Sequence, residues 1–274
     1  MSVDISVVIP TFRRPRELTE SLDSALAQRG VSLEVVVVDD SPEGSAAAVV
    51  EHLRDPRVRY LRNPNPSGGM PSRVRNLGWP LTSGRLVHFL DDDDRVPPGH
   101  YAVVQEAFAR YPDTGLVFGR IEPFGAGPSD QLEHERRYFA SAARKAATAN
   151  RLGRRWAFSA YMLFDMALLV CSASMVRREC LVAAGGFDPD IRLMEDAEYH
   201  LRIMRRFGAR FLDRIALHYR ISSPSLMHAP NPPPEQLAQE KAGRRAMQAK
   251  YRSQHGALDF WLLAAAARGL LRFL

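Results

Sequence analysis

The chain has 274 residues, and 37 Lys and Arg against 31 Asp and Glu give it a formal charge of +6. Its length suits one large domain or a domain with an appendage, and 46% hydrophobic residues exclude wholesale disorder. The start, MSVDISVVIP, lacks the features of a secretory leader, and Cys171 and Cys180 are the two cysteines. We therefore expect a reduced, cytoplasmic compartment. The basic balance leaves nucleic acid, anionic membrane and phosphorylated small molecules open as partners.

The first 120 residues alternate between predicted strands and helices. Apolar, β-branched runs favour strands at 5–9, 33–38, 58–61, 86–90 and 116–118. Helical patterns lie between them, at 15–28, 46–53, 71–79 and 98–110. This alternation predicts an α/β fold with a mostly parallel sheet and helices on both faces.

From about Pro123 the alternation is expected to stop. Helical segments are predicted at 136–155, 177–184, 194–207 and 240–252. The apolar stretch 161–176 contains Asp165 and is too short to span a bilayer. The apolar tail 258–274 is interrupted by charged residues, so we do not interpret it as a membrane span either.

Four consecutive aspartates, Asp91 to Asp94, directly follow the predicted strand LVHFL. A run of acidic residues is often only a solvated surface. Here the carboxylates follow a core strand, and the ligand crevice of an open α/β sheet lies at the carboxyl ends of its strands. A divalent cation that prefers oxygen ligands would offset their mutual repulsion. The run therefore favours a metal or ligand site.

A second acidic pair, Asp39-Asp40, follows the predicted strand LEVVVV. An acid in this position commonly binds a nucleotide, although a turn before Ser41 is the simpler alternative. The chain has neither a GxxxxGK[ST] loop nor a GxGxxG after its first strand. A phosphate-binding enzyme of this kind would use a metal with arginines, and four arginines lie at or near strand ends. They are Arg13, Arg14, Arg73 and Arg75.

Several short motifs follow one another along the chain. They are PTFRR at 10–14, VVDDS at 37–41, VRNLG at 74–78, GRLVHFLDDDD at 84–94, GGFD at 185–188, ED at 195–196 and LR at 201–202. In this order and spacing they resemble the motifs of the family 2 glycosyltransferases, inverting enzymes of the GT-A fold. Arg13 stands where that family usually has asparagine, and Ser41 where it has glycine. The resemblance covers roughly residues 3–222.

The resemblance implies a metal-dependent inverting transfer from a UDP- or dTDP-linked sugar to a hydroxyl acceptor, in polysaccharide, glycolipid or metabolite synthesis. It implies a catalytic domain at 1–222, with a nucleotide-sugar half at 1–120 and an acceptor-side half at 121–222. Residues 223–274 would form a helical extension.

The same resemblance implies a role for each motif residue. Asp94 would be the principal ligand of Mn²⁺ or Mg²⁺ and Asp92 the second, while Asp92 and Asp93 would also contact the donor, Asp93 at the ribose. The rest of the donor site would be formed by Pro10, Thr11, Phe12, Arg14, Asp40, Arg73 and Arg75. The register of the four aspartates stays ambiguous by one residue.

Inversion needs a base that deprotonates the acceptor hydroxyl. The resemblance gives this role to Asp196, with Glu195 and Gly186 on the acceptor side. The alternative is that Glu195 and Asp196 only charge the start of a helix, where carboxylates are favoured. The family's late histidine is missing, and His218 or His228 is a candidate substitute.

Other functions compete with this interpretation. A sugar nucleotidyltransferase would share the sheet and the acids but would need a glycine-rich loop. A basic nucleic-acid-binding protein or an inactive carbohydrate-binding relative is a non-enzymatic alternative, but four aspartates in the crevice would repel nucleic acid. The basic second half and the apolar tail suggest a peripheral contact with the inner face of the cell membrane or with a lipid-linked acceptor.

Overall fold

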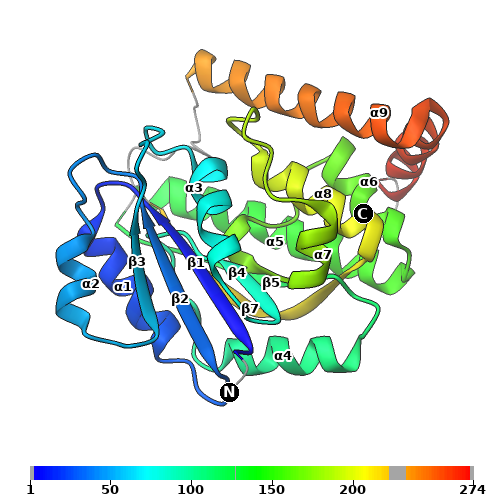
Figure 1. Cartoon of the computed structure of the whole chain (residues 1–274). Coiled ribbons are helices and arrows are strands. Elements are labelled where there is room, and N and C mark those ends of the chain that lie inside the picture. The colour runs from blue at the N-terminus through cyan, green and yellow to red at the C-terminus, as the bar shows by residue number, and fades with distance from the viewer. Residues whose placement is uncertain (1–2, 127, 222–232, 272–274) are drawn as a thin grey trace.

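The computed structural model describes residues 3–126, 128–221 and 233–271. Its centre is a seven-stranded sheet of order β3-β2-β1-β4-β6-β5-β7, with helices on both faces (Figure 1). The strands are β1 (Ile5–Thr11), β2 (Leu33–Asp39), β3 (Val58–Arg62), β4 (Leu86–Phe89), β5 (Leu116–Phe124), β6 (Ser174–Arg177) and β7 (Ala209–Arg220). Only β6 is antiparallel to its neighbours, β4 and β5. The predicted mostly parallel α/β fold is confirmed.

The helices of the first half connect parallel strands. They are α1 (Pro15–Leu26), α2 (Ala47–Leu53), α3 (Pro71–Gly78) with the short 3₁₀ turn η1 (Trp79–Leu81), and α4 (His100–Arg110). All lie within one or two residues of their predicted bounds. Strands β1 and β2 are buried along almost their whole length, because helices cover both sides of this part of the sheet.

The second half differs from the sequence expectation. It contains α5 (Ser129–Leu152), α6 (Arg155–Phe164), η2 (Cys171–Ala173), α7 (Arg178–Ala184), α8 (Glu195–Phe207) and α9 (Pro234–Leu271). No strand was predicted beyond Pro123, but β6 and β7 complete the sheet. Strand β6 has only four residues, and β7 lies at the sheet edge with charged residues in its middle, so neither shows a strong local pattern.

Asp165 has a structural explanation that its sequence context did not offer. Its carboxylate lies 2.6 Å from Lys145 Nζ on α5. The pair is half-buried, so the acid is compensated by a partner twenty residues earlier.

Helix α3 lies close against the sheet because of a glycine in the VRNLG motif. A Cβ on Gly78 would come within 2.5 Å of Val8 Cγ1 and 2.9 Å of Val38 Cγ2. The helix therefore approaches β1 and β2 at a distance that a larger residue would prevent. This packing brings Arg75 and Asn76 of the same helix to the carboxyl edge of the sheet.

Helix α9 packs along the outside of α6 and α8, and Gly256, with φ 84° and ψ 161°, breaks it into two segments (Figure 1). Met247 and Tyr251 anchor the first segment, and Leu263 and Ala267 anchor the second. The predicted helix at 240–252 thus belongs to a longer element that is packed on the domain. No helix in the described part of the chain is long and apolar enough to cross a membrane.

Candidate active site

A pocket of about 410 Å³ opens at the carboxyl ends of β1, β2 and β4. Its walls come from the loops after these strands, from α3, from the start of α8 and from the end of β7. Four of the predicted donor residues lie in the wall on the β1 side: Pro10, Thr11, Phe12 and Arg14. The strand ends therefore meet at one cavity, as parallel strands require.

Three of the four consecutive aspartates line this pocket, and the fourth does not. Asp91, Asp92 and Asp93 are pocket residues. Asp94 is buried, and one of its oxygens accepts a hydrogen bond of 3.0 Å from the backbone N–H of Arg220 on β7. Its other oxygen is buried without a partner. The structure thus differs from the sequence expectation, in which Asp94 faced the site as principal metal ligand.

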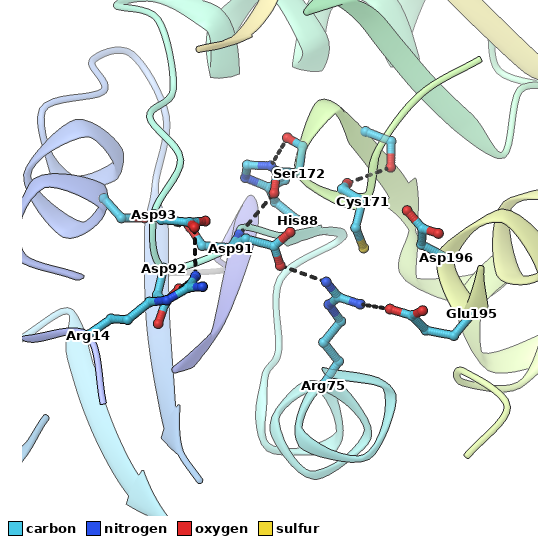
Figure 2. A network of polar contacts seen from close by, with 12 residues as sticks. Arg14, Arg75, His88, Asp91, Asp92, Asp93, Cys171, Ser172, Glu195 and Asp196 are labelled. Atoms are coloured by element: carbon cyan, nitrogen blue, oxygen red, sulfur yellow. Dashed lines mark hydrogen bonds and ion pairs between the residues drawn. The ribbon is translucent and has the colours of Figure 1, made fainter. Parts of the chain in front are cut away.

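Asp92 and Asp93 share a single arginine (Figure 2). Arg14 Nη1 lies 2.6 Å from an oxygen of Asp93 and 3.2 Å from one of Asp92. The hydroxyl of Thr11 donates to Asp92 at 2.7 Å. Burial raises the pKa of Asp92 to about 7 and shifts that of Asp93 in the same direction, while Arg14 opposes both shifts. Carboxylates in this state favour an added cation.

Arg75 joins the aspartate run to the ED motif. Its guanidinium lies 2.6 Å from Asp91 Oδ1 and 3.0 Å from Glu195 Oε1, and its side chain is only 3% exposed (Figure 2). The guanidinium carbon also lies 5.2 Å from the centre of the Phe187 ring. Arg75 is a pocket residue, as expected, but its charge is already shared by two acids. Arg73 is exposed on α3 and is not part of the pocket wall.

Asp196 lies in the first turn of α8, opposite the aspartates. Its side chain is turned toward the cavity, near Cys171 (Figure 2). One carboxylate oxygen accepts a 2.7 Å hydrogen bond from Ala197 N–H. Burial raises the pKa of Asp196, and it raises that of Glu195 to about 7 with a further contribution from the charge of Asp196. Both acids of the ED motif thus line the pocket, and each has a pKa above its ordinary value.

Gly186 has a packing role and is not part of the pocket wall. A Cβ at this position would come within 2.3 Å of Asn76 Oδ1. Asn76 in turn donates to Phe187 O at 2.8 Å and accepts from Phe187 N at 2.9 Å. The GGFD and VRNLG motifs thus contact each other, and the acceptor contact expected of Gly186 is not supported by its place in the fold.

Asp40 is buried in the base of the pocket with every lone-pair direction used. It accepts hydrogen bonds from Asn63 Nδ2 (2.5 Å), the Ser67 N–H and hydroxyl (both 2.9 Å) and Gly69 N–H (2.6 Å). A carboxylate offers about four such positions. Asp40 therefore fixes the loop 63–69, whose Gly69 lies against the ring of Phe12.

Several residues in or beside the pocket wall were not among the predicted site residues. Cys171 lies in the wall, and burial raises the pKa of its thiol. The Ser172 hydroxyl accepts from Asp91 N–H at 3.0 Å. Both belong to η2, a short turn that follows an irregular stretch and carries no motif. Tyr219 and Arg220 come from β7, the strand that local pattern missed.

Of the two candidate histidines, the structure describes His218, and this residue does not reach the pocket. His218 Nδ1 lies 3.1 Å from Glu122, and its backbone pairs with Arg95. It is not a pocket residue. His228 lies outside the described residues.

The sequence matches the family model described as glycosyl transferase family 2 over residues 6–169, more than half of the chain. The chain belongs to this family. Among curated relatives, an uncharacterized protein of Mycobacterium tuberculosis is 31% identical over 218 residues, 76% of this chain and 64% of that protein. The GalNAc(5)-diNAcBac-PP-undecaprenol beta-1,3-glucosyltransferase of Campylobacter jejuni is 35% identical over 104 residues, 37% of this chain and 33% of that enzyme. The chain spans less than two-thirds of each relative's length.

Solved structures share the fold of this family member. S. aureus TarS 1–349 in complex with UDP superimposes with a TM-score of 0.63 and 17% identity, covering 96% of this chain and 70% of that one. The mannosyltransferase PcManGT of Pyrobaculum calidifontis, in complex with GDP-Man and Mn²⁺, gives 0.58 and 17%, covering 98% and 81%. The GT-A fold expected from the motifs is confirmed.

Replacing Arg75 by Met should lower the free energy of unfolding by about 3–5 kcal/mol, because Asp91 and Glu195 would lose their shared buried cation. Arg73→Met on the same helix is the matched control, and it should change stability by less than about 0.5 kcal/mol because Arg73 is exposed. Urea unfolding of both variants measures the difference. Equal effects would contradict the bridging role of Arg75.

Ionisation of Glu195 should lower the stability of the fold as pH rises from about 4.5 to 7, while the buried histidines His88, His100 and His200, whose pKa values burial lowers, act in the opposite direction. In the unfolded chain Glu195 ionises near its ordinary pKa of 4.5, whereas the folded protein holds its proton up to about pH 7. The Glu195 contribution therefore favours unfolding as the pH rises through this window, by up to about 3 kcal/mol.

Glu195→Gln removes this contribution, so its unfolding free energy relative to that of the unmodified protein should increase between pH 5 and pH 7. Glu106→Gln, at an exposed position on α4, is the control for loss of an acidic charge. Parallel pH curves for the unmodified protein and Glu195→Gln would show that Glu195 does not titrate in this range.

Proposed function

We propose that this protein is a metal-dependent inverting glycosyltransferase that moves a sugar from a UDP- or dTDP-linked donor to a hydroxyl acceptor. The observation that supports it best is the arrangement of two acidic groups in one pocket. Asp91 to Asp93 lie on the β4 side, Asp196 lies on the α8 side, and Arg75 connects the two through Asp91 and Glu195.

The donor would occupy the β1 and β2 side of the pocket. Pro10, Thr11 and Phe12 provide a wall for a nucleoside, and the ring of Phe12 offers a stacking surface. Asp40 supports this wall by holding loop 63–69 in place through hydrogen bonds from its backbone N–H groups. To accept a hydrogen bond from the nucleotide base, the Asp40 carboxylate would have to give up one of these bonds. TarS, a neighbour in fold, has been solved with UDP and with UDP-GlcNAc, which agrees with a uridine donor.

A divalent cation fits the chemistry of the aspartate run if its two ligands are each one residue earlier than the motif suggested. We propose Asp91 and Asp93 as the acidic pair, with Asp93 as the principal ligand, because the carboxylate of Asp94 is bound to β7. In the described ranges, no three His, Cys, Asp or Glu side chains converge on one point. Mn²⁺ or Mg²⁺ bound here would take its other ligands from phosphate oxygens and water, as Mg²⁺ commonly does.

Such an ion would neutralise charge on the leaving diphosphate. The chain's own cations near this position are Arg14 and Arg220, both in the pocket wall. They would bind the phosphates and support the same charge. Arg75 is less suited to this purpose, because its side chain is only 3% exposed and bridges Asp91 to Glu195, whereas the side chain of Arg14 is 42% exposed.

Asp196 is proposed as the general base. The acceptor oxygen would form a bond to the anomeric carbon as its proton passes to the Asp196 carboxylate. The bond from that carbon to the diphosphate oxygen breaks on the opposite face, and the nucleoside diphosphate leaves with the electron pair. A raised pKa brings Asp196 nearer the working pH of a general base.

The acceptor is proposed to be a saccharide or a lipid-linked saccharide. The Campylobacter relative is named for a glucosyltransferase acting on a PP-undecaprenol-linked saccharide, and a 39% identical segment of 98 residues matches the succinoglycan biosynthesis protein ExoO of Rhizobium meliloti. Both names support synthesis of a glycolipid or polysaccharide.

The register of the aspartates can be tested with Mn²⁺ and UDP. Asp93→Asn should weaken Mn²⁺ binding in the presence of UDP by at least about tenfold, because it removes a charged ligand. Asp94→Asn should change it by less than about threefold, because an amide oxygen can still accept from Arg220 N–H. Electron paramagnetic resonance of free Mn²⁺ gives both affinities. A larger loss of Mn²⁺ affinity in Asp94→Asn than in Asp93→Asn would show that Asp94 is the principal ligand instead.

Asp196→Asn should lower release of nucleoside diphosphate from the productive donor by about 10²–10⁴-fold while leaving donor affinity unchanged. A panel of UDP- and dTDP-sugars with Mn²⁺ identifies that donor, and calorimetry measures its affinity. Asp130→Asn, an exposed acid in the first turn of α5, is the control for simple helix charging. Full turnover in Asp196→Asn, or no binding of any donor in the panel, would contradict the proposal.

A further inference from the structure

The second segment of α9 has apolar side chains on two opposite faces. One face packs on the domain through Leu263 and Ala267. The other exposes Leu258, Trp261 and Leu262, at 76%, 57% and 62% of their surface. Spacings of three and four residues place these three side chains together on one side of a helix. The part of the chain that the structure describes thus leaves these three apolar side chains exposed, and we call this surface the α9 face.

The charge of helix α9 is mainly positive. The helix contains six basic residues and three acids, of which Glu235 and Glu240 lie in its first two turns and the third lies beside the α9 face. The six basic residues are Lys241, Arg244, Arg245, Lys250, Arg252 and Arg268. The third acid, Asp259, lies 2.7 Å from Arg205 and also accepts from the hydroxyl of Tyr251, so its charge is compensated.

Three of these basic residues are exposed on the same side of the first segment. Lys241, Arg245 and Arg252 are separated by four and seven residues, so they follow one line along the helix. Arg268 is exposed beyond Trp261 on the second segment. Cations therefore lie at both ends of the apolar cluster.

We propose that the α9 face docks on an anionic membrane surface, with α9 lying in the plane of the lipid headgroups. Leucine and tryptophan beside exposed arginine and lysine are typical of helices that lie in this region. Each cation near an anionic surface adds attraction that salt weakens. A second copy of this chain is the less favourable occupant, because it would bring an equally basic surface against this one.

Docking here would place the pocket next to the membrane. Lys250 Nζ lies 2.6 Å from Asp188 of the GGFD motif and 2.9 Å from Glu198 of α8. Gly243 packs so closely on Leu193, a pocket residue, that a Cβ would approach its carbonyl oxygen to 2.3 Å. The helix that carries the docking face therefore also supports the acceptor-side wall. Delivery of a lipid-linked acceptor to that wall rests on the proposed function, whereas the docking does not.

The test uses the full chain with vesicles of equal parts phosphatidylglycerol and phosphatidylcholine, and with vesicles of phosphatidylcholine alone. The protein should float with the anionic vesicles and not with the neutral ones, and raising salt from about 0.1 M to about 0.5 M should release it. Replacing Leu258, Trp261 and Leu262 together by Ser should reduce partitioning by at least about tenfold. Val182→Ser with Leu152→Ser, two exposed apolar positions on α7 and α5, is the matched control and should bind normally.

Tryptophan emission is a second measure of docking, and Trp261→Phe is its control because this variant keeps an apolar side chain at position 261. The unmodified protein should shift its tryptophan emission to shorter wavelength on anionic vesicles, and Trp261→Phe should bind without that shift. Absence of flotation, or unchanged binding by the triple variant, would overturn the proposal. So would a dimer in sedimentation that the triple variant abolishes without any vesicle binding. Donor affinity is measured in parallel without vesicles, so a failure of the proposed function is recognised separately.

Discussion

The site depends on one buried cation between two acids. Arg75 reaches Asp91 at the end of β4 and Glu195 at the start of α8, and it is almost inaccessible to solvent. It therefore fixes the distance between the donor-side acids and Asp196, which follows Glu195 directly. Helix α3 can hold Arg75 there because Gly78 lets the helix approach the sheet and Asn76 binds the backbone of Phe187. Three segments far apart in the chain are aligned by this interaction.

The remaining carboxylates of the aspartate run have few cationic partners in the fold. Arg14 alone faces both Asp92 and Asp93, and one oxygen of Asp94 is buried without a partner. Burial keeps the pKa values of these acids above their ordinary range. Folding therefore carries a local electrostatic penalty, which a cation bound beside these carboxylates would reduce.

Helix α9 connects the site to the outer surface of the molecule. Its inner side supports the loop before α8 through Lys250 and Gly243, and its outer side carries the α9 face. The two sides belong to one element, so a surface on which α9 docks would be held at a fixed position relative to Asp196. The basic residues of α9 would then attract an anionic surface close to the acceptor side of the pocket.

Local pattern in the sequence was sufficient to predict the first-half strands and helices. The common edge of parallel strands was sufficient to bring Asp40 and the aspartate run to one crevice. The ED pair was assigned to the site through the family resemblance alone. Only the tertiary structure decided which of four consecutive aspartates face the pocket, because Asp94 is held by Arg220, 126 residues later. Likewise, β6, β7, the packing of Gly186 on Asn76 and the pairing of Asp165 with Lys145 depend on partners distant in the chain. Local pattern carries no information about such partners, since they meet only when the sheet is complete.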